Sequence, residues 1–524
     1  MQLSMYHIYQ ALLVIVVTIV FIGVYACIRH KKKYDYIHLT VICAATVLPY
    51  FSYAVFNPLY DGPAFTALSV NRDPIQGDTV RNWGDTIECK PKYIYEPRTV
   101  EEVQDIVKSS YKVRVVGGGH SFSPLVCTNE TLLTMRHMKR VLYTNETSVT
   151  VQAGSTIQEL NANLDDSIVH GFGSIQDQSL AGAFSTSHHG LTFYSFAEDV
   201  IEITAVLANG TVFETNDLYY WRSHLGLLGV ITSMTINTYP NSRVKISKHK
   251  VTLDEAIQML PTADAGIIET NYNQRERALL KHITILGPDS SVFTIRDNSF
   301  VSMLWDSIVV PVSVLFPSLT EFPLLDIADT DEEEDLMVQA WSKYPEYGMM
   351  YSAFAIPFEN CSAFIRSIDA KNHAVSTLLV RYLNAQHNTT CMTFARQESC
   401  VVDVYDLQSQ PSLEEFHLDL EQTVLLYGGT SHWGKYYVSD MKYQIRNIPC
   451  YNSFKSYRDI MDPEQKFVND YAAEILELQT GTRYKVSGYE TKRIVFIAVL
   501  LASLTTIISM FVLASLPGRE ERFK

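Results

Sequence analysis

Three consecutive glycines follow a valine-rich stretch in 113-VRVVGGGHSFSP-124, and this segment constrains the fold more than any other part of the chain. The valines are typical of a β-strand. The glycines lack Cβ atoms, so successive backbone N–H groups can converge on one anion. A triphosphate loop would end in Gly-Lys-Ser/Thr, but His120 follows the glycines, and a dinucleotide loop would have glycine where Phe122 stands. Two interpretations remain, a tight connection or a pyrophosphate site made of backbone groups.

A second glycine-rich segment, 171-GFGSIQDQSLAGAFSTSHHG-190, follows in the same region, and two such loops could hold one extended ligand. Upstream, residues 97–110 predict a helix with Thr99 as its N-cap. Downstream, Asn209-Gly210 lies between two alternating apolar runs and predicts a β-hairpin. This succession of helices and strands predicts an α+β domain over residues 81–245.

Residues 246–480 predict a second α+β domain, in which longer strands alternate with helical stretches. The segments 349-MMYSAFAIPF-358 and 376-STLLVRYL-383 are typical of strands, and 454–476 is helical in pattern but interrupted at Pro463. The acidic run 329-DTDEEED-335 is interpreted as a solvated loop. A metal site is the weaker interpretation because no partner ligands lie nearby, so no metal centre is predicted.

Long apolar stretches at both ends of the chain predict transmembrane helices over residues 9–28, 37–56 and 494–516, with a linker over residues 57–80. A cleaved signal peptide is the alternative for the first stretch, but the basic cluster 29-RHKKK-33 follows at once without a cleavage site. This cluster favours a cytoplasmic position for its end of the helix. We therefore expect a multi-pass membrane protein whose body is lumenal or exterior, most readily in a membrane of the endoplasmic reticulum type.

Charge and cysteine content exclude several classes of function. The chain has a net charge of −15, and both ends are basic, so the body is more acidic still; this argues against nucleic acid as a partner. Of eight cysteines, Cys27 and Cys43 lie in predicted spans, and the other six show no C-x-x-C pair, which indicates neither a zinc site nor a disulfide scaffold. Five N-glycosylation sequons agree with a lumenal glycoprotein: Asn129, Asn145, Asn209, Asn360 and Asn388.

Several dispersed segments together resemble the vanillyl-alcohol-oxidase-type FAD-binding family, in its sugar-1,4-lactone oxidase branch. They occur in the family's order: 82-NWGDTIECKPKYIYEP-97, 115-VVGGGHSFS-123, 133-LTMRHMKRVL-142, 173-GSIQDQSLAGAFSTSHHG-190, 224-HLGLLGVI-231, 432-HWGK-435 and 462-DPEQKFVNDY-471. The resemblance covers the body and none of the predicted spans. It implies a two-lobed FAD-binding domain followed by an α+β substrate domain, or cap.

The resemblance implies FAD as the cofactor, with the pyrophosphate on the glycine loop and a covalent bond from His120 to the flavin. A histidine that only hydrogen-bonds the phosphate is the alternative. The FAD contacts implied by the matching positions are Gly117, Gly118, Gly119, His120, Ser121, Gly173, Ser174, Ser179, Gly182, Ser185, His189 and Ile231.

The implied reaction is oxidation of a sugar lactone by FAD with O2 as the acceptor and H2O2 as product, as in the last step of ascorbate-type synthesis. The family's substrate residues match Arg381, Lys435 and His432. A lysine could stabilise a developing alkoxide and a histidine could relay a proton. The family pattern Glu-x-Arg is broken here, because Leu379 stands where the glutamate is expected. Either the substrate differs from a standard aldonolactone, or another acid substitutes, or turnover is weak or absent.

Two further functions stay open at the level of sequence. One is an FAD-linked oxidoreductase of the same fold that acts on another alcohol or on a lipid. The other is a flavin-binding membrane protein without catalytic activity, suggested by Leu379.

Overall fold

The computed structural model describes the body of the chain, and all described residues belong to one compact unit formed by residues 63–296 and 313–487. The described ranges are 75–76, 79–82, 86–164, 166–173, 175–190, 192–270, 276–287, 332–336, 350–369, 375–386, 388–406, 413–439, 442–445 and 447–478. Within them, no helix has the length and apolarity to cross a membrane. The predicted spans 9–28, 37–56 and 494–516, and most of the linker 57–80, lie outside the described residues.

A four-stranded sheet carries the glycine loop. Its order is β1-β4-β6-β5, with β5 parallel to β6 and β6 parallel to β4. The predicted helix is confirmed as α3, and the Thr99 hydroxyl caps it by accepting from the Glu102 N–H. Val103 and Val107 of α3 are fully buried against this sheet. The elements of this part are β1 (Ile75–Gln76), β2 (Val80–Arg81), β3 (Glu88–Cys89), β4 (Tyr93–Tyr95), α3 (Val100–Ser109), β5 (Val113–Val116) and β6 (Thr131–Thr134).

A five-stranded antiparallel sheet, in the order β11-β10-β12-β8-β7, completes this half of the molecule. The predicted hairpin is confirmed: β10 pairs with β11, and Gly210 in the turn has φ of +80°, which favours glycine. We call residues 75–240 the N-terminal lobe. Its remaining elements are β7 (Val141–Thr144), β8 (Ser148–Gln152), α4 (Ile157–Ala162), β9 (Ser167–Ile168), α5 (Leu180–Ser185), β10 (Val200–Val206), β11 (Val212–Thr215), β12 (Val230–Asn237) and β13 (Tyr239–Pro240).

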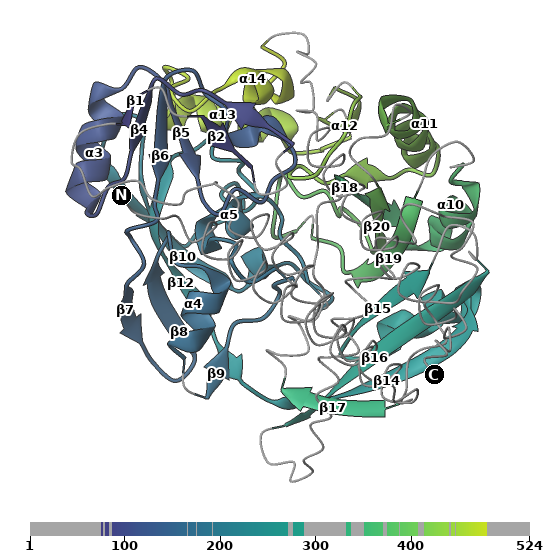
Figure 1. Ribbon diagram of the computed structural model, residues 1–524. Helices are drawn as coiled ribbons and strands as arrows, with labels where there is room; N and C mark the ends of the chain where they lie inside the picture. Colours follow the sequence, from purple (N-terminus) through teal and green to yellow (C-terminus); the bar gives the residue numbers. More distant parts are fainter. Residues whose placement is uncertain are drawn as a thin grey trace, which may run out of the picture. The chain divides into compact units, whose positions relative to one another are not determined.

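The last helices, α13 (Tyr451–Met461) and α14 (Asp470–Ile475), return to the N-terminal lobe and lie beside its four-stranded sheet (Figure 1). They are the helical pattern expected over 454–476, interrupted around Pro463. Arg114 of β5 fastens this return, because its buried guanidinium donates to the carbonyls of Leu125, Leu225 and Phe467. One side chain thus joins three segments beneath the glycine loop.

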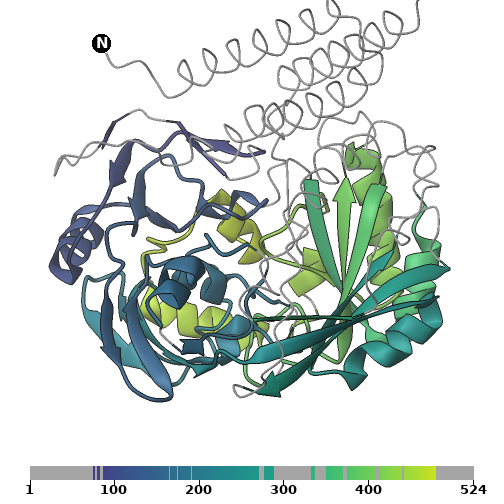
Figure 2. The ribbon, with the colours of Figure 1, turned by 60° about the horizontal axis from the view of Figure 1, so that its bottom comes forward.

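The C-terminal lobe (residues 243–445) is built on an eight-stranded sheet in the order β17-β14-β16-β15-β19-β20-β18-β21. The sheet twists strongly, so β14 and β16 cross the direction of β18, β19 and β20 (Figure 2). Its elements are β14 (Arg243–Thr252), α6 (Leu253–Met259), β15 (Ala265–Thr270), β16 (Arg277–Gly287), β17 (Glu332–Leu336), β18 (Met350–Pro357), α10 (Cys361–Ser367), β19 (Val375–Leu383), β20 (Ser399–Asp406), α11 (Leu413–Leu426), β21 (Thr430–Ser431) and α12 (Lys442–Ile445).

One expectation for this sheet is wrong. The acidic run was expected to be a solvated loop, but Glu332–Leu336 form the edge strand β17, paired with β14. The partner stretch of β14 carries Arg243 and Lys245, paired with Leu336 and Glu334, so a basic strand neighbours the acidic one. Charge in this segment marks a sheet edge rather than a loop.

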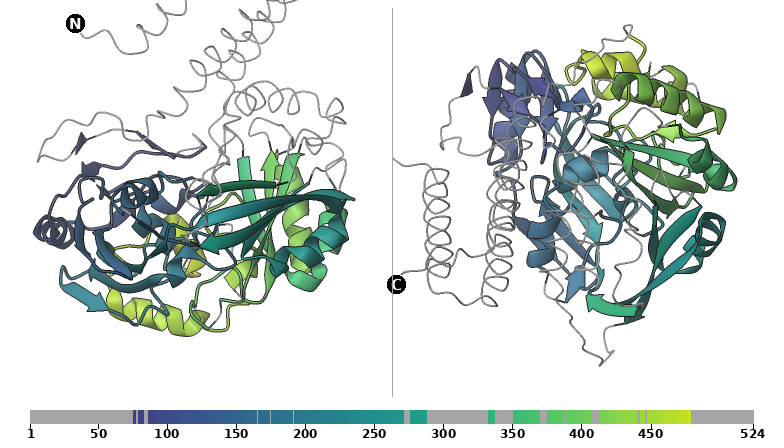
Figure 3. Two further views of the ribbon diagram at one scale, coloured as in Figure 1. Left: turned by 90° about the horizontal axis from the view of Figure 1, so that it is seen from below. Right: turned by 45° about the vertical axis from the view of Figure 1, so that its right-hand side comes forward.

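The two faces of the eight-stranded sheet pack against different parts of the protein. Leu378, Val380 and Val402 point to the side covered by α6, α10 and α11, which lie on the outer side of the sheet in Figures 1 and 3. Leu379 and Val401, on the opposite face, join the core of the N-terminal lobe. Because side chains alternate along a strand, the odd-numbered residues of β19 and β20 face the interior between the lobes.

Cysteine pairing corrects a second expectation. The six cysteines of the body were expected not to form a disulfide scaffold, yet they form three bonds: Cys89–Cys127, Cys361–Cys400 and Cys391–Cys450. The partners lie 38, 39 and 59 residues apart in the sequence. Spacing motifs could not reveal these pairs, since the fold alone brings their Cα atoms together.

Candidate active site

A large cavity runs from the glycine loop to the inner face of the eight-stranded sheet. Its walls come from both glycine segments, from α5, from the stretch around Leu225 and Ile231, and from the C-terminal lobe. Ser174 lies outside the described residues. Every other predicted site residue lines this cavity: Gly117, Gly118, Gly119, His120, Ser121, Gly173, Ser179, Gly182, Ser185, His189, Ile231, Arg381, His432 and Lys435.

The two glycine segments touch so closely that side chains could not be added between them. A Cβ on Gly117 would lie 1.8 Å from the Ser179 hydroxyl oxygen, and one on Gly118 would lie 2.9 Å from the Asp177 carbonyl oxygen. Gly119 has φ of +72°, a left-handed conformation that favours glycine. Each of the three glycines therefore has a separate steric or conformational reason, and together they keep backbone exposed to the cavity.

Hydrogen bonds fix the far end of the glycine loop. The Asn82 side chain donates to the Ser121 carbonyl at 2.9 Å, and the Phe122 N–H donates to the Gly434 carbonyl at 2.8 Å. The Ser123 hydroxyl donates to the Trp433 carbonyl at 2.8 Å. The glycine loop is thereby tied to the segment that carries His432 and Lys435, 310 residues away in the sequence.

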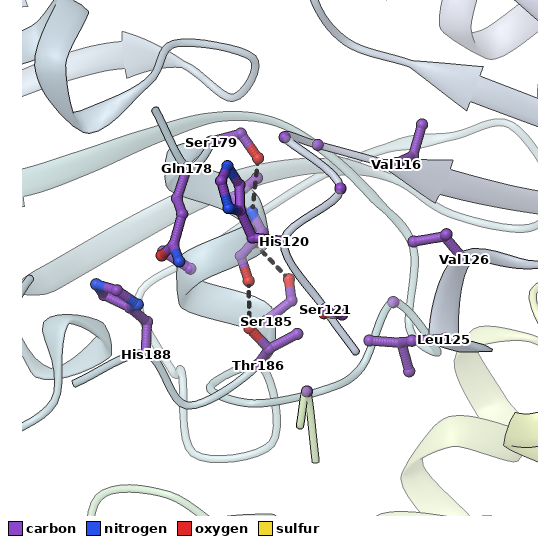
Figure 4. Close-up of a pocket in the computed structure, with 18 of the residues that line it drawn as sticks. Val116, His120, Ser121, Leu125, Val126, Gln178, Ser179, Ser185, Thr186 and His188 are labelled. Carbon is purple, nitrogen blue, oxygen red and sulfur yellow. Dashed lines mark hydrogen bonds between the residues drawn. The ribbon is translucent and has the colours of Figure 1, made fainter. Parts of the chain in front are cut away.

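His120 turns from the glycine loop towards the second glycine segment, where Figure 4 shows it beside Gln178 and Ser179. Its Nε2 atom lies 3.0 Å from an Asp177 carboxylate oxygen, and its side chain is 8% exposed. Burial raises the pKa of Asp177, but the hydrogen bond and the charge of His120 outweigh burial and lower it overall. The carboxylate accepts the Nε2 proton of His120, so Nδ1 is the ring nitrogen that can carry the lone pair.

Ser179 and Ser185 shape α5 more directly than they shape the open cavity. The Ser179 hydroxyl accepts from the Gly182 N–H at the start of the helix. Ser185 donates to the Ala181 carbonyl and lies 2.9 Å from Nε2 of His224. Burial, with the charge of Arg114 as a smaller cause, lowers the pKa of His224 to about 3. These serines hold the wall that the glycine loop approaches.

A pair of adjacent histidines closes the middle of the cavity. Nε2 of His188 accepts from the Gly173 N–H at 2.6 Å. Burial, helped by the charges of Lys435, Arg381 and His120, lowers the pKa of His188 to about 3. His189 has its Nδ1 3.3 Å from the Ser187 carbonyl, while its buried Nε2 has no hydrogen-bond partner among the described residues. Its pKa also lies well below the usual value because of burial.

His432 is held at both ring nitrogens. Its Nδ1 accepts from the Gly434 N–H at 3.0 Å, and its Nε2 lies 3.3 Å from the Ser187 carbonyl. Burial first, and the charge of Lys435 second, keep the pKa of His432 well below its usual value. The ring is therefore neutral, with its proton on Nε2. This geometry favours a fixed orienting role, and a proton relay would require one of these two bonds to break.

Lys435 and Arg381 bring positive charge to this end of the cavity. The Lys435 Nζ lies 3.2 Å from the centroid of the Tyr351 ring and 5.8 Å from that of Phe122. Tyr351 is fixed in turn by stacking on Tyr405, with ring centroids 4.7 Å apart. The quadrupole of each aromatic ring attracts a cation over its face, so the two rings hold the ammonium in place.

Arg381 has a carboxylate partner after all. Its guanidinium lies 2.9 Å from a carboxylate oxygen of Asp403, whose side chain is fully buried. The expected partner position, Leu379 on β19, lies opposite Asp403 on β20. Of the three explanations for the broken Glu-x-Arg pattern, the geometry therefore supports a substituted acid. The sequence signal was Asp403, an acid flanked by valines inside the strand 400-CVVDVYD-406, which the sequence reasoning missed.

The cavity fits a long ligand with an anionic middle, as FAD is. Exposed backbone of Gly117–Gly119 offers N–H groups to a pyrophosphate, apolar walls such as Leu125 and Ile231 lie at one end, and the cationic pair lies at the other. The lining residues that sequence reasoning had not singled out include Gln178, Thr186, His188, His224 and Tyr351.

Comparison with known proteins gives matches along most of the chain. Residues 91–216 match the FAD binding domain family, and residues 252–475 match the D-arabinono-1,4-lactone oxidase family. L-gulonolactone oxidase of Mus musculus is 25% identical over 442 residues, which cover 76% of this chain and 98% of that protein. L-gulono-1,4-lactone dehydrogenase of Mycobacterium tuberculosis (strain H37Rv) is also 25% identical, over 75% of this chain and 98% of that protein.

Solved structures agree in fold. The crystal structure of cholesterol oxidase from B. sterolicum superposes with a TM-score of 0.61 and 16% identity, over 77% of this chain and 97% of that one. At this identity the similarity shows a shared fold and nothing about the substrate.

Proposed function

Because the chain belongs to the FAD-binding sugar-1,4-lactone oxidase family, we propose that it oxidises a carbinol of a sugar 1,4-lactone and passes the electrons to O2. FAD is the cofactor. Bound FAD would supply the acceptor for a hydride and return the electrons to O2, forming H2O2.

The observation that carries this function is the continuity of the cavity. The glycine cradle of the N-terminal lobe and the Arg381–Lys435 pair of the C-terminal lobe open into the same space. A substrate that reaches Lys435 therefore lies in the same cavity as the cofactor. The large cavity is lined by residues from both halves of the sequence, so it can hold a cofactor and a substrate side by side.

The side chains at the Arg381–Lys435 end of the cavity have three roles: charge stabilisation, orientation and proton transfer. Lys435 and Arg381 would bind the substrate hydroxyl and ring oxygens and stabilise the negative charge that develops when the hydroxyl proton leaves. His432, bonded at both nitrogens, fixes the Gly434 turn that positions Lys435. Neutral His189 also lines the cavity, and its buried Nε2, which has no hydrogen-bond partner among the described residues, would receive that proton.

O2 consumption and H2O2 release by the full-length protein in detergent, with gulono-, galactono- and arabinono-1,4-lactone, test this function. Turnover of at least one lactone is the expected result. Bleaching of the flavin by other alcohols or by a sterol, without any response to the three lactones, would instead support an oxidoreductase of the same fold with another substrate.

The alternative of a flavin-binding protein without catalytic activity is no longer supported by Leu379. It rested on Leu379, which was expected to leave Arg381 without a carboxylate. Asp403 supplies a carboxylate 2.9 Å from the Arg381 guanidinium, so Arg381 has an acidic partner.

We propose that His120 carries the flavin covalently. The contact between His120 Nε2 and Asp177 supports this, because it directs the lone pair of the ring to Nδ1 as the bonding atom. Acid-precipitated wild-type protein is expected to stay yellow, and His120→Ala is expected to release all of its flavin into the supernatant. Asp177→Ala should slow attachment, whereas Asp177→Asn, which still offers an oxygen, should slow it less. Complete release of flavin from acid-precipitated wild-type protein would contradict covalent attachment.

We also propose that the protein is anchored in a membrane with its body on the lumenal or exterior side. Three disulfides among the described residues support an oxidising compartment. The sequons at Asn145 and Asn209 are exposed at hairpin turns, which supports glycosylation there.

Digestion with an N-glycosidase should increase the electrophoretic mobility of the native protein, and Asn145→Gln and Asn209→Gln should each remove part of that shift. An unchanged mobility, together with protease sensitivity of the body in intact microsomes, would place it in the cytosol.

A further inference from the structure

Arg381 has its acidic partner on a neighbouring strand, whereas the family pattern predicts a partner on its own strand. Leu379 of β19 lies between two acidic residues of neighbouring strands, because it pairs with Glu269 of β15 on one side and with Asp403 of β20 on the other. Directly paired residues of antiparallel strands project to the same face. A carboxylate therefore exists on each side of Leu379, although none exists at 379 itself.

The two acids are committed to different bases. Glu269 lies in contact with Lys281 of β16, and both side chains are partly exposed, at 24% and 19%. Asp403 lies 2.9 Å from Arg381, with the two side chains 0% and 7% exposed. Neither Glu269 nor Lys281 lines the cavity, whereas Arg381 does. Of these two acids, Asp403 is therefore the one whose ion-pair partner, Arg381, lines the cavity.

Burial explains why this pair matters for orientation. An ionised carboxylate without solvent is stable only beside a fixed cation, and a guanidinium held against a buried carboxylate is restricted in its position. Leu379 fills the space that a longer acidic side chain on β19 would occupy, and it packs into the core shared by the two lobes. The carboxylate thus reaches Arg381 across the strand pair rather than along the strand.

We propose that Asp403 is the positioning residue for Arg381 and that positions 379 and 403 form an exchangeable pair, of which one must be acidic and the other apolar. This proposal rests on the proposed oxidase function for its kinetic readout. It assigns to β20 a role in substrate orientation that the sequence pattern would assign to β19.

Replacement of Asp403 by asparagine tests the positioning role. Anaerobic reduction of the flavin by the lactone is expected to slow by about 100-fold, the effect of misplacing a substrate-binding group by about 1 Å. Reoxidation of the photoreduced flavin by O2 is expected to be unchanged, because that step does not need the substrate. Glu269→Gln is the matched control: it removes the acid on the other side of Leu379 and is expected to change neither half-reaction.

The exchange variant tests the pairing more sharply. Leu379→Glu alone places a third carboxylate between Glu269 and Asp403, and the repulsion is expected to lower the rate of flavin reduction. In the double variant Leu379→Glu, Asp403→Leu, the acid has moved to β19, and the rate is expected to rise about tenfold above that of Asp403→Leu alone. A purely structural role for Asp403 predicts no such recovery.

Failure of the proposal and failure of the oxidase function give different results. If no lactone bleaches the wild-type flavin, the oxidase function fails. The Arg381–Asp403 interaction is then still measured by thermal unfolding of Asp403→Leu, Arg381→Met and the double variant Arg381→Met, Asp403→Leu. This double variant should unfold at a higher temperature than either single variant, and additive losses of stability would overturn the proposal. If a lactone does bleach the wild type and Asp403→Asn reduces equally fast, the proposal is overturned while the function stands.

Discussion

Replacing Lys435 with methionine is expected to lower kcat by about 100- to 1,000-fold, the loss typical of removing one charged or hydrogen-bonding group from a developing oxyanion. The ammonium of half-buried Lys435 lies over the Tyr351 and Phe122 rings. Its charge would act directly on an alkoxide that forms beside it. Methionine keeps the length and apolar contacts of the side chain and removes only the charge. Stopped-flow absorbance during anaerobic reduction by the lactone measures the effect directly.

Lys139→Met is the matched control for this variant. Lys139 pairs with Glu159 on the surface, and both side chains are well exposed, at 38% and 41%. Surface ion pairs contribute little to stability, so flavin content and kcat should both stay at the wild-type level. If Lys435→Met reduced its flavin as fast as Lys139→Met, the site as described here would be wrong.

Gly117→Ala is expected to abolish flavin binding and to lower the thermal stability of the N-terminal lobe. The added methyl would lie 1.8 Å from the Ser179 hydroxyl oxygen and 2.9 Å from the Ser179 Cβ, so the glycine loop and α5 would have to separate. Overpacking a close contact of this kind costs about 1–3 kcal/mol or more. Visible absorbance of the purified protein measures the flavin, and circular dichroism during heating measures the stability.

A second change, Ser179→Gly, separates the steric effect from any other. It removes both atoms that the new methyl would meet, and glycine in place of serine at a helix N-cap costs only a few tenths of a kcal/mol. The double variant Gly117→Ala, Ser179→Gly should therefore recover most of the lost stability. If the double variant were as unstable as Gly117→Ala, the close approach of the two segments would not be the reason for glycine at position 117.

Local signals in the sequence predicted the parts of the fold that depend on neighbouring residues. Thr99 as N-cap and the acids of the first turn predicted α3, and Asn209-Gly210 predicted the β10–β11 hairpin. These devices act within a few residues, so a single sequence contains all that they require. The glycine loop belongs to the same class, since the run of glycines after a strand shows that backbone is exposed there.

Features that depend on pairing between distant strands could not be predicted. The acidic run forms edge strand β17 by pairing with β14, in which Lys245, 89 residues earlier in the sequence, lies opposite Glu334. Cysteine spacing motifs also gave no indication of the disulfide Cys391–Cys450. In both cases the deciding contact is a property of the folded chain.

The sequence by itself determined the chemistry that this protein can hold: a backbone cradle at Gly117–Gly119, a histidine at its lip, and a lysine and an arginine in the second half of the chain. The tertiary structure alone decided how these groups work together. It placed Asp177 on His120 and Asp403 on Arg381, and it bonded both nitrogens of His432. The physical reason is that composition and local pattern fix which charges exist, whereas strand register and burial fix which charge each of them meets.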